Sequence, residues 1–568
     1  MSALKTSDAP SPQIGKLSGR LKQWLRHFRA TPPAPVSPDW FLPAEVARLH
    51  KALQPASAVS VDDTTWADLE VERYLRLLSG ELSLFGRQVL THRLRSYGGL
   101  ASDGFACAPD ALLLSSSPAS ALRETALAQA AMAALAPLRQ VNIDVAGLLF
   151  DERLPTPPRW APALTAVPLG FLGAAALLGG GAVGAAVLLA VTTLALSSAA
   201  QLALHGPMKR WQRQRRALLA MMLAAKAVAS TVQQALPSGA TPWGRLPAAA
   251  AQSTQAQGLL RCFEPGWVER VPALADYANL VAAYEYRRFL RALRRLEQQR
   301  QALCGLFEHM ACLEADLALH LHVHKLPVVC RAQVQAGAAL AAVGLVHPLL
   351  PAAHPLSFVL DCPGAFISGQ NGAGKSTLLR SVGLNLLVAQ GFGFCYAQRA
   401  TLPRAPVFSS LQSEDSLGTA TSLFGAELKR ASDLHRAAQQ HPGAVFLVDE
   451  LFRGTNPVES VAATAALGHA LARRGPVLLA SHHLALASAL AATFTAWCVE
   501  RDAGGAAVLR PGVLTQTNAL ALLAEQGFPS TLLADAQRVA GWLQSQTVVL
   551  SAPPVLSGSD GATALTPP

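Results

Sequence analysis

The sequence predicts an α/β domain of the P-loop type that follows an all-α region with long helices and a two-helix apolar hairpin. Three observations predict this division. A glycine-rich motif at 369–376 follows an apolar run and precedes a helical pattern. A stretch of 44 residues, 161–204, contains no Asp, Glu, Lys, Arg or His. Before residue 327, apolar residues often recur at steps of three, four or seven, which is typical of packed helices.

Composition narrows the classes of protein that need to be considered. The chain has 568 residues, enough for several domains, and a net charge of +11 at pH 7, which suits nucleic acid or lipid head groups as a partner. Charged residues make up only 15% and the mean hydropathy is +0.28, so a membrane segment is indicated. Eight scattered cysteines without a C-x-x-C pair argue against a disulfide framework or a zinc site, and favour a reducing compartment. The N-terminus lacks the apolar core of a secretion signal.

Changes in composition divide the chain into six segments. The first is expected to be disordered around a basic amphipathic helix, which could lie on an acidic membrane surface or pack on the next domain. The last is rich in Ser, Pro and Gly and is also expected to be disordered. In order, the segments are 1–39, a helical core at 40–160, a transmembrane hairpin at 161–204, more helical core with a lever at 205–326, an α/β domain with closing helices at 327–546, and the tail at 547–568.

The uncharged stretch is long enough for two membrane spans. A bilayer core needs about 20 apolar residues per helix, so we expect spans at 164–180 and 183–204 joined at three glycines. Trp160 and Trp211 flank the stretch, and five Lys or Arg residues follow it between 209 and 216. The positive-inside rule then puts both ends in the cytoplasm of a bacterial-type inner (plasma) membrane, as a multi-pass protein with a cytoplasmic α/β domain. A hairpin buried in a soluble core is the alternative.

A continuous helical pattern from about 275 to 324 predicts a lever helix. At 1.5 Å per residue it would be roughly 75 Å long. Five arginines between 287 and 295 cluster in its first half. They could contact DNA phosphates or form an ordinary solvated face.

The strand, loop and helix pattern around 369–376 predicts a phosphate-binding loop. The segment fits G-x-x-x-x-G-K-[ST], in which glycines let backbone N–H groups turn toward phosphate oxygens at a helix N-terminus. We expect Lys375 to reach the β- and γ-phosphates of ATP and Ser376 to ligate Mg²⁺. The nucleotide-binding residues are Gly369, Gln370, Asn371, Gly372, Ala373, Gly374, Lys375, Ser376 and Thr377.

A second apolar run, 445–448, ends in two acidic residues. Asp449, at the tip of a buried strand, is expected to hold Mg²⁺ together with Ser376. Glu450 is expected to orient or deprotonate the attacking water, which makes it a catalytic residue.

A third apolar run, 478–480, leads to two histidines. His482 at this strand tip is expected to hydrogen-bond the γ-phosphate and to act as the second catalytic residue. His483 is expected to be a surface group.

Several of these segments resemble the MutS mismatch-repair ATPase family. The likeness is specific over about 340–545 and looser in the helical region. The similar segments are Tyr74–Leu94, Leu313–Asp316, His347–Pro348, Gly369–Gln390, Ser422–Leu428, Asp449–Asn456, Ala480–His482 and Thr517–Leu543.

The resemblance implies an ATPase domain of the ABC/MutS type with a composite site. Ser422 would serve the nucleotide bound by a partner subunit, and Arg453–Asn456 would line the same interface, so a homodimer is expected. The resemblance also implies binding of double-stranded DNA in mismatch repair or a related DNA transaction.

The family's mismatch-reading domain is not visible in the sequence. About 360 residues precede the glycine-rich loop, and the apolar hairpin occupies part of them. The expectation is therefore a membrane-anchored MutS-like ATPase, with an ATP-switched membrane scaffold that does not bind DNA as the alternative. A transporter-type ATPase is less favoured, because no Leu-Ser-Gly-Gly-Gln signature lies between Lys375 and Asp449.

Overall fold

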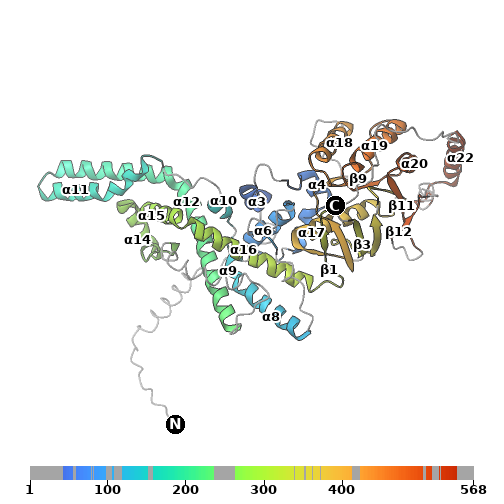
Figure 1. The fold of residues 1–568 in the computed structure, drawn as a ribbon. Helices are drawn as coiled ribbons and strands as arrows, with labels where there is room; N and C mark the ends of the chain where they lie inside the picture. The colour runs from blue at the N-terminus through green and yellow to red at the C-terminus, as the bar shows by residue number, and fades with distance from the viewer. Residues whose placement is uncertain are drawn as a thin grey trace, which may run out of the picture.

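The computed structural model has an elongated shape, with a hairpin of helices projecting at one end and a β-sheet domain at the other (Figure 1). The expected disordered segments 1–39 and 547–568, and also Asn371 and Ser422, lie outside the residues that the structure describes. The described residues are 42–54, 59–78, 80, 82–97, 105–107, 118–141, 143–150, 158–235, 263–337, 339–350, 353–360, 362–370, 372–411, 423–502, 507–514, 524 and 526–546.

The region before the hairpin is helical. Its helices are α2 (Pro43–Val46), α3 (Arg48–Leu53), α4 (Asp63–Asp68), α5 (Val71–Leu78), α6 (Leu84–Arg95), α8 (Pro118–Ala134), α9 (Ala136–Arg139) and α10 (Ala146–Phe150). Asp62 caps α4, since its carboxylate accepts a bond of 2.9 Å from the Thr65 amide.

The hairpin consists of the 3₁₀ helix η2 (Ala161–Ala166), α11 (Val167–Gly179) and α12 (Val183–Ala235). Two helical stretches, Pro162–Gly179 and Val183–Thr231, are long and apolar enough to cross a membrane. The helix continues past the predicted end of the second span at 204, because α12 is one helix of 53 residues that runs through Pro207. Leu204, Trp211 and Leu218 are buried in the core on both sides of this proline, so packing offsets its cost of about 3 kcal/mol.

The predicted continuous lever is three helices, so the estimate of 75 Å was wrong. They are α14 (Pro272–Ala282), α15 (Tyr284–Gln298) and α16 (Arg300–Val323). Ala283 has a left-handed backbone (φ 45°), and the Asn279 side chain accepts a bond of 2.8 Å from the Glu285 amide just past this break. The break lets α14 pack on the hairpin while α16 packs on α6 and α8.

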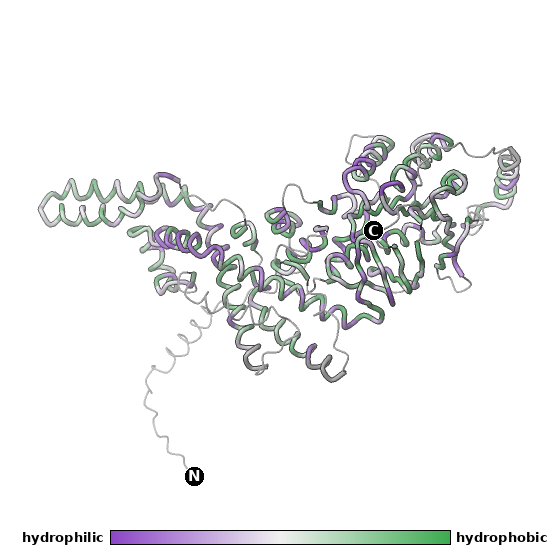
Figure 2. Tube along the Cα trace, viewed as in Figure 1, coloured by the Kyte–Doolittle hydropathy of each residue, from purple (hydrophilic) through white to green (hydrophobic). Residues whose placement is uncertain are grey.

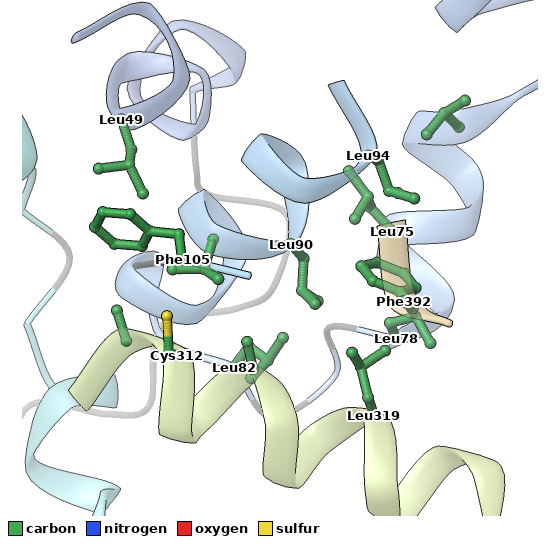
Figure 3. Packing of buried hydrophobic residues seen from close by; sticks show 14 of the residues in the cluster. Leu49, Leu75, Leu78, Leu82, Leu90, Leu94, Phe105, Cys312, Leu319 and Phe392 are labelled. Carbon is green, nitrogen blue, oxygen red and sulfur yellow. The ribbon is translucent and has the colours of Figure 1, made fainter. Parts of the chain in front are cut away.

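A continuous apolar core joins the helical region to the sheet domain. Figure 3 shows side chains from α5, α6 and α16 beside Phe392 of α17 (Lys375–Phe392), while Leu49 of α3 lies on the opposite side of the same cluster. Two buried acidic residues fix α16 against the first helices. Glu314 accepts bonds from the Ser83 and Gly86 amides at 2.9 and 3.0 Å, and Asp316 pairs with the buried Arg93 guanidinium at 2.7 Å. Removing either charge of the Arg93 pair would strand the other in the interior.

The C-terminal part is a mixed α/β domain with three sheets. The main sheet has the order β12-β11-β5-β10-β9-β8, parallel except for β12, and a four-stranded sheet has the order β2-β7-β3-β4. A two-stranded sheet pairs β1 with β6. The strands are β1 (Cys330–Arg331), β2 (Gln333–Gln335), β3 (Leu340–Leu345), β4 (Leu356–Leu360), β5 (Gly364–Gly369), β6 (Phe394–Cys395), β7 (Arg399–Pro403), β8 (Val407–Ser410), β9 (Val445–Asp449), β10 (Val477–Ala480), β11 (Phe494–Arg501) and β12 (Ala507–Pro511).

The helices of this domain surround the main sheet (Figure 1). Every residue of β5, β9 and β10 is buried, which explains why these strands read as unbroken apolar runs in the sequence. Because the three strands are parallel neighbours, their carboxyl ends meet at one edge of the sheet. Besides α17, the helices are α18 (Leu423–Gln440), α19 (Pro457–Ala472), α20 (Ala485–Leu490) and α22 (Ser530–Gln546).

Candidate functional site

The glycine-rich loop connects the buried strand β5 to α17. Gly372 and Gly374 have φ values of 75° and 108°, a backbone conformation that residues with a Cβ rarely adopt. The Lys375 side chain is buried, and its Nζ donates to the carbonyl oxygens of Gly369 at 2.9 Å and Gln370 at 3.3 Å. The ammonium group therefore lies against the inside of the loop, next to the N-terminus of an 18-residue helix, where anions are favoured.

Ser376 and Asp449 meet at the adjacent strand end. The register pairs Asp449 with Ala480 of β10, and Ala480 with Ile367 of β5, so β9 and β10 end level while β5 continues to Gly369, where the glycine-rich loop begins. The Ser376 hydroxyl donates a hydrogen bond to Asp449 Oδ2. Burial raises the pKa of the Asp449 carboxyl, while this hydrogen bond and the Lys375 charge act in the opposite direction.

This pair of oxygen groups fits Mg²⁺. In phosphoryl-transfer sites Mg²⁺ is held by one or two protein oxygens, several waters and the phosphates of the substrate, not by a full protein cage. In the described part of the chain, no group of three or more His, Cys, Asp or Glu side chains is arranged to hold a metal. A hydroxyl and a carboxylate beside a phosphate-binding loop are the donors that such a site uses.

Glu450 lies one residue past β9 in an unusual backbone conformation, with φ at 49°. Its amide donates to the Ala480 carbonyl at 3.0 Å, which fixes the residue against β10. The Glu450 Oε1 atom is 2.9 Å from His482 Nδ1, and Oε2 is 3.9 Å from Arg453 Nε. The expected catalytic residues Glu450 and His482 are therefore in direct contact, although 32 positions separate them in the sequence.

His483 does not share this contact with Glu450. Its ring lies beside that of His482, with centroids 4.0 Å apart, and its backbone amide donates to Ser481 Oγ at 3.1 Å. Partial burial lowers the pKa of His483, and the neighbouring His482 acts in the same direction. The geometry thus separates the roles of the two histidines.

The loop after β9 contacts α18, the helix that follows Ser422. Glu427 Oε2 accepts a bond of 3.4 Å from the Gly454 amide, and its Oε1 is 4.0 Å from Arg453 Nε. Asn456 caps α19 by accepting from the Val458 amide at 2.9 Å. The contact ties the start of α18, next to Ser422, to the segment that carries Glu450.

Two groups of contacts around this site had no clear signal in the sequence. Arg501, at the end of β11, donates from Nη2 to the Gly372 carbonyl at 2.8 Å and so braces the glycine-rich loop. Asp68 of α4 accepts bonds from Ser409 Oγ at 2.7 Å and the Leu411 amide at 2.8 Å. Arg380 of α17 donates to the Asp68 carbonyl at 3.0 Å. These three contacts of Asp68 join positions more than 300 residues apart, and the Arg380 contact connects the helical region to the helix that begins at Lys375.

The comparisons with known proteins identify the α/β domain. Residues 365–543 match the family model of MutS domain V. Endonuclease MutS2 of Thermus thermophilus is 36% identical over 148 residues, which are 26% of this chain and 20% of that protein. Endonuclease MutS2 of an Anaeromyxobacter species is 30% identical over 280 residues, 45% of this chain and 34% of that protein. The DNA mismatch repair protein MutS of Thermus aquaticus is 30% identical over 178 residues, 30% of this chain and 22% of that protein.

The likeness is partial in both directions. The chain spans between a fifth and about a third of the length of these relatives. The domain V match begins inside β5 and ends in α22, so it contains the glycine-rich loop, Ser376, Asp449, Glu450 and His482, but not Asp68 of α4.

Proposed function

Because the chain is a member of the MutS family through its domain V, we propose that it is an ATPase that binds and hydrolyses ATP with Mg²⁺. One observation carries this proposal. The glycine-rich loop, the Ser376–Asp449 pair and the Glu450–His482 pair lie at adjacent carboxyl ends of three parallel strands. Phosphate binding, metal binding and water activation require these three kinds of group within one site.

Each group has a proposed role. The loop from Gly369 to Thr377 binds the phosphates, and Lys375 leaves its loop carbonyls to contact the β- and γ-phosphates. Ser376 and Asp449 would hold Mg²⁺, which would supply positive charge against the negative charge that develops on the phosphates. Glu450 orients the attacking water, and His482 keeps the Glu450 carboxylate in place and senses the γ-phosphate. The unusual φ of Glu450 supports this role, since strained residues are common at functional sites.

We also propose that two copies complete each other's sites, with Ser422 of one copy acting on the nucleotide of the other. The contact between Glu427 and Gly454 supports this, because it couples the helix after Ser422 to the loop that carries Glu450. An arrangement of this kind would make dimer formation depend on the γ-phosphate. ATP-dependent dimerisation can be followed by light scattering.

Membrane anchoring by the hairpin is a further part of the proposal. In the most apolar stretch of each hairpin helix, only 17% and 11% of the residues are buried within the protein, so these are not core helices of the sheet domain. The basic residues beyond Leu204 favour an orientation with the ATPase domain in the cytoplasm, at the inner membrane of a bacterium. A chain of this type would act as a switch at the membrane surface.

Double-stranded DNA is the proposed partner, because the similar proteins are an endonuclease, MutS2, and a DNA mismatch repair protein, MutS. The test is ATP turnover of the purified chain with duplex, branched and mismatched DNA across a salt series. Stimulation that falls steeply with salt would support phosphate contacts, because each neutralised phosphate contributes a slope of about −0.9 in log–log terms. Turnover that ignores every DNA would favour the ATP-switched membrane scaffold, and no turnover at all would remove the ATPase proposal.

A further inference from the structure

A polar cavity near the hairpin is lined by arginines. It has a volume of about 760 Å³ and is lined by Arg288, Arg291, Arg294 and Arg295 of α15, with Tyr284 and Glu264. Arg291, Arg294 and Arg295 are exposed and make no ion pair with any described residue. The one acidic lining residue, Glu264, cannot balance four guanidinium groups, so the cavity carries net positive charge. Guanidinium groups bind phosphate oxygens through paired hydrogen bonds.

The cavity is held at a fixed place beside the hairpin. Arg288 Nη1 lies 3.1 Å from Glu269 Oε1, and Arg215 of α12 lies 3.1 Å from the other oxygen of the same carboxylate. All three side chains are largely buried, with exposed fractions of 10 to 18%. Arg288 is therefore a structural member of the cavity wall, which leaves the three exposed arginines available to a ligand.

Two further contacts fix the position of α14 and α15 along the length of the hairpin. Ser197 Oγ donates to the Leu280 carbonyl at 3.2 Å, and Gln201 Nε2 donates to the Asn279 carbonyl at 2.8 Å. On the other leg, Arg287 donates to the Thr165 carbonyl. At 1.5 Å per residue, Ser197 and Gln201 are about 21 and 27 Å from the start of α12, comparable with the 30 Å hydrocarbon core of a bilayer. If the hairpin inserts, α14 and α15 therefore meet the head-group layer.

The segment from Trp267 through α14 has an outer face with the composition of such a layer. Trp267, Val271, Leu274, Tyr277 and Val281 recur at steps of three or four, and they are 72, 50, 39, 71 and 38% exposed. Aromatic side chains with one apolar and one polar end are typical of membrane interfaces. The strongly hydrophilic α15 lies next to α14, and both helices lie beside the apolar hairpin (Figure 2). Apolar, aromatic and basic side chains are therefore gathered in one part of the molecule, as they are at a membrane surface.

We propose that the arginine cavity on α15 binds the phosphate of an anionic lipid head group, while α14 lies in the interface beside the hairpin. The proposal rests on the proposed membrane anchoring. A lipid is favoured over DNA because the cavity lies directly next to exposed apolar and aromatic side chains, which a phosphodiester backbone in water would leave exposed. The lipid phosphate would replace water on Arg291, Arg294 and Arg295.

The test compares phosphatidylglycerol with phosphatidylcholine. The full-length chain is placed in phosphatidylcholine nanodiscs, and binding of added phosphatidylglycerol is measured by native mass spectrometry and by titration. The variant combines Arg291→Gln, Arg294→Gln and Arg295→Gln. The matched control removes the same charge from exposed arginines of the sheet domain, with Arg399→Gln, Arg404→Gln and Arg436→Gln. Equal unfolding midpoints of the two variants establish that both are folded.

The cavity variant should bind phosphatidylglycerol at least about tenfold more weakly than the control, since each of the three basic residues at an acidic surface contributes a factor of about five. Equal affinity of the two variants would overturn the proposal. So would a cavity variant that keeps lipid binding and loses duplex DNA binding, because the arginines would then contact nucleic acid. Partition into neutral vesicles is measured separately. If the chain inserts into neutral vesicles but does not prefer phosphatidylglycerol, only the proposed lipid site is wrong. If the chain never inserts, the proposed membrane anchoring is wrong as well.

Discussion

The sheet domain and the hairpin use apolar side chains in opposite ways. Every residue of β9 and β10 is buried, whereas Leu169, Leu172 and Leu188 of the hairpin are 68, 65 and 65% exposed. Burying such a side chain contributes about 1.5–3 kcal/mol, so the sheet obtains this stabilisation from its own chain. The exposed leucines of the hairpin could gain the same stabilisation only from an environment outside the chain. This difference is what supports the proposal that the hairpin lies in lipid while the sheet domain lies in water.

Charges placed on the hairpin give the strongest test of this difference. We expect Leu172→Asp combined with Leu188→Asp to abolish partition into vesicles, since each Asp at the centre of a membrane helix costs about 2.5–3.5 kcal/mol. Stability in water should change little, because both positions are exposed. Vesicle sedimentation and thermal unfolding measure the two effects. Leu428→Asp, on exposed α18, is the matched control, and an unchanged partition of the double variant would place the hairpin outside the bilayer.

The next test concerns the polar groups that the sheet domain holds at its edge. We expect Glu450→Gln to lower ATP turnover by about 10²–10⁴-fold while ATP affinity is kept, because the amide cannot accept a proton from water. His482→Ala should have a smaller effect in the same direction, since His482 contacts Glu450 at 2.9 Å. His483→Ala is the matched control with turnover near that of the unchanged chain. Retained turnover in Glu450→Gln would assign water activation to another residue.

Lys375→Ala should weaken the binding of ATP as well as lower its turnover. Loss of the only cation inside the loop is expected to weaken ATP binding by about 30–1000-fold, the equivalent of 2–4 kcal/mol. Equilibrium dialysis or calorimetry with Mg²⁺ and ATP gives the affinity. Vesicle partition should be unchanged, because the loop and the hairpin lie at opposite ends of the molecule (Figure 1). An unchanged affinity would argue against the phosphate site.

The smallest expected effect is on stability. Burial raises the pKa of Asp449 in the folded chain, so the unfolded chain loses this proton at lower pH than the folded chain. Between the two pKa values the folded state binds more protons, and stability falls as pH rises. Asp449→Asn removes this loss. Without nucleotide the variant should unfold at an equal or slightly higher temperature than the unchanged chain, with the difference growing through that pH window and then levelling off.

A lower unfolding temperature of Asp449→Asn at every pH would contradict this account of the Asp449 environment. The same variant should lose Mg²⁺-dependent turnover, because an amide is a weaker ligand for a hard cation than a carboxylate. Ser376→Ala, which removes the other oxygen group of the pair, is the natural comparison.

Local patterns in the sequence predicted the features that a single short segment determines. The glycine-rich loop and the tips at Asp449 and His482 each follow one buried strand, and a buried parallel strand is visible as an apolar run. The sequence also indicated the mixed α/β domain and its MutS likeness, which the domain V match confirms. The roles of the individual side chains remain predictions.

Features set by packing between distant segments could not be read in the same way. The apolar pattern runs through Ala283 without interruption, yet the chain turns there because α14 packs on the hairpin, whereas α15 leads into α16, which packs on α6 and α8. The pattern likewise gave no reason for α12 to continue past Pro207. The Arg501 contact with Gly372 depends on β11 lying next to β5, a strand order that periodicity does not encode.

The most direct test of the central claim is ATP turnover measured on vesicles. The full-length chain is mixed with neutral lipid vesicles and floated on a density gradient, and hydrolysis is assayed in the floated fraction. We predict that ATPase activity floats with the lipid, and that Glu450→Gln floats equally well without activity. Activity that stays at the bottom of the gradient, while the vesicles rise without protein, would contradict a membrane-anchored ATPase.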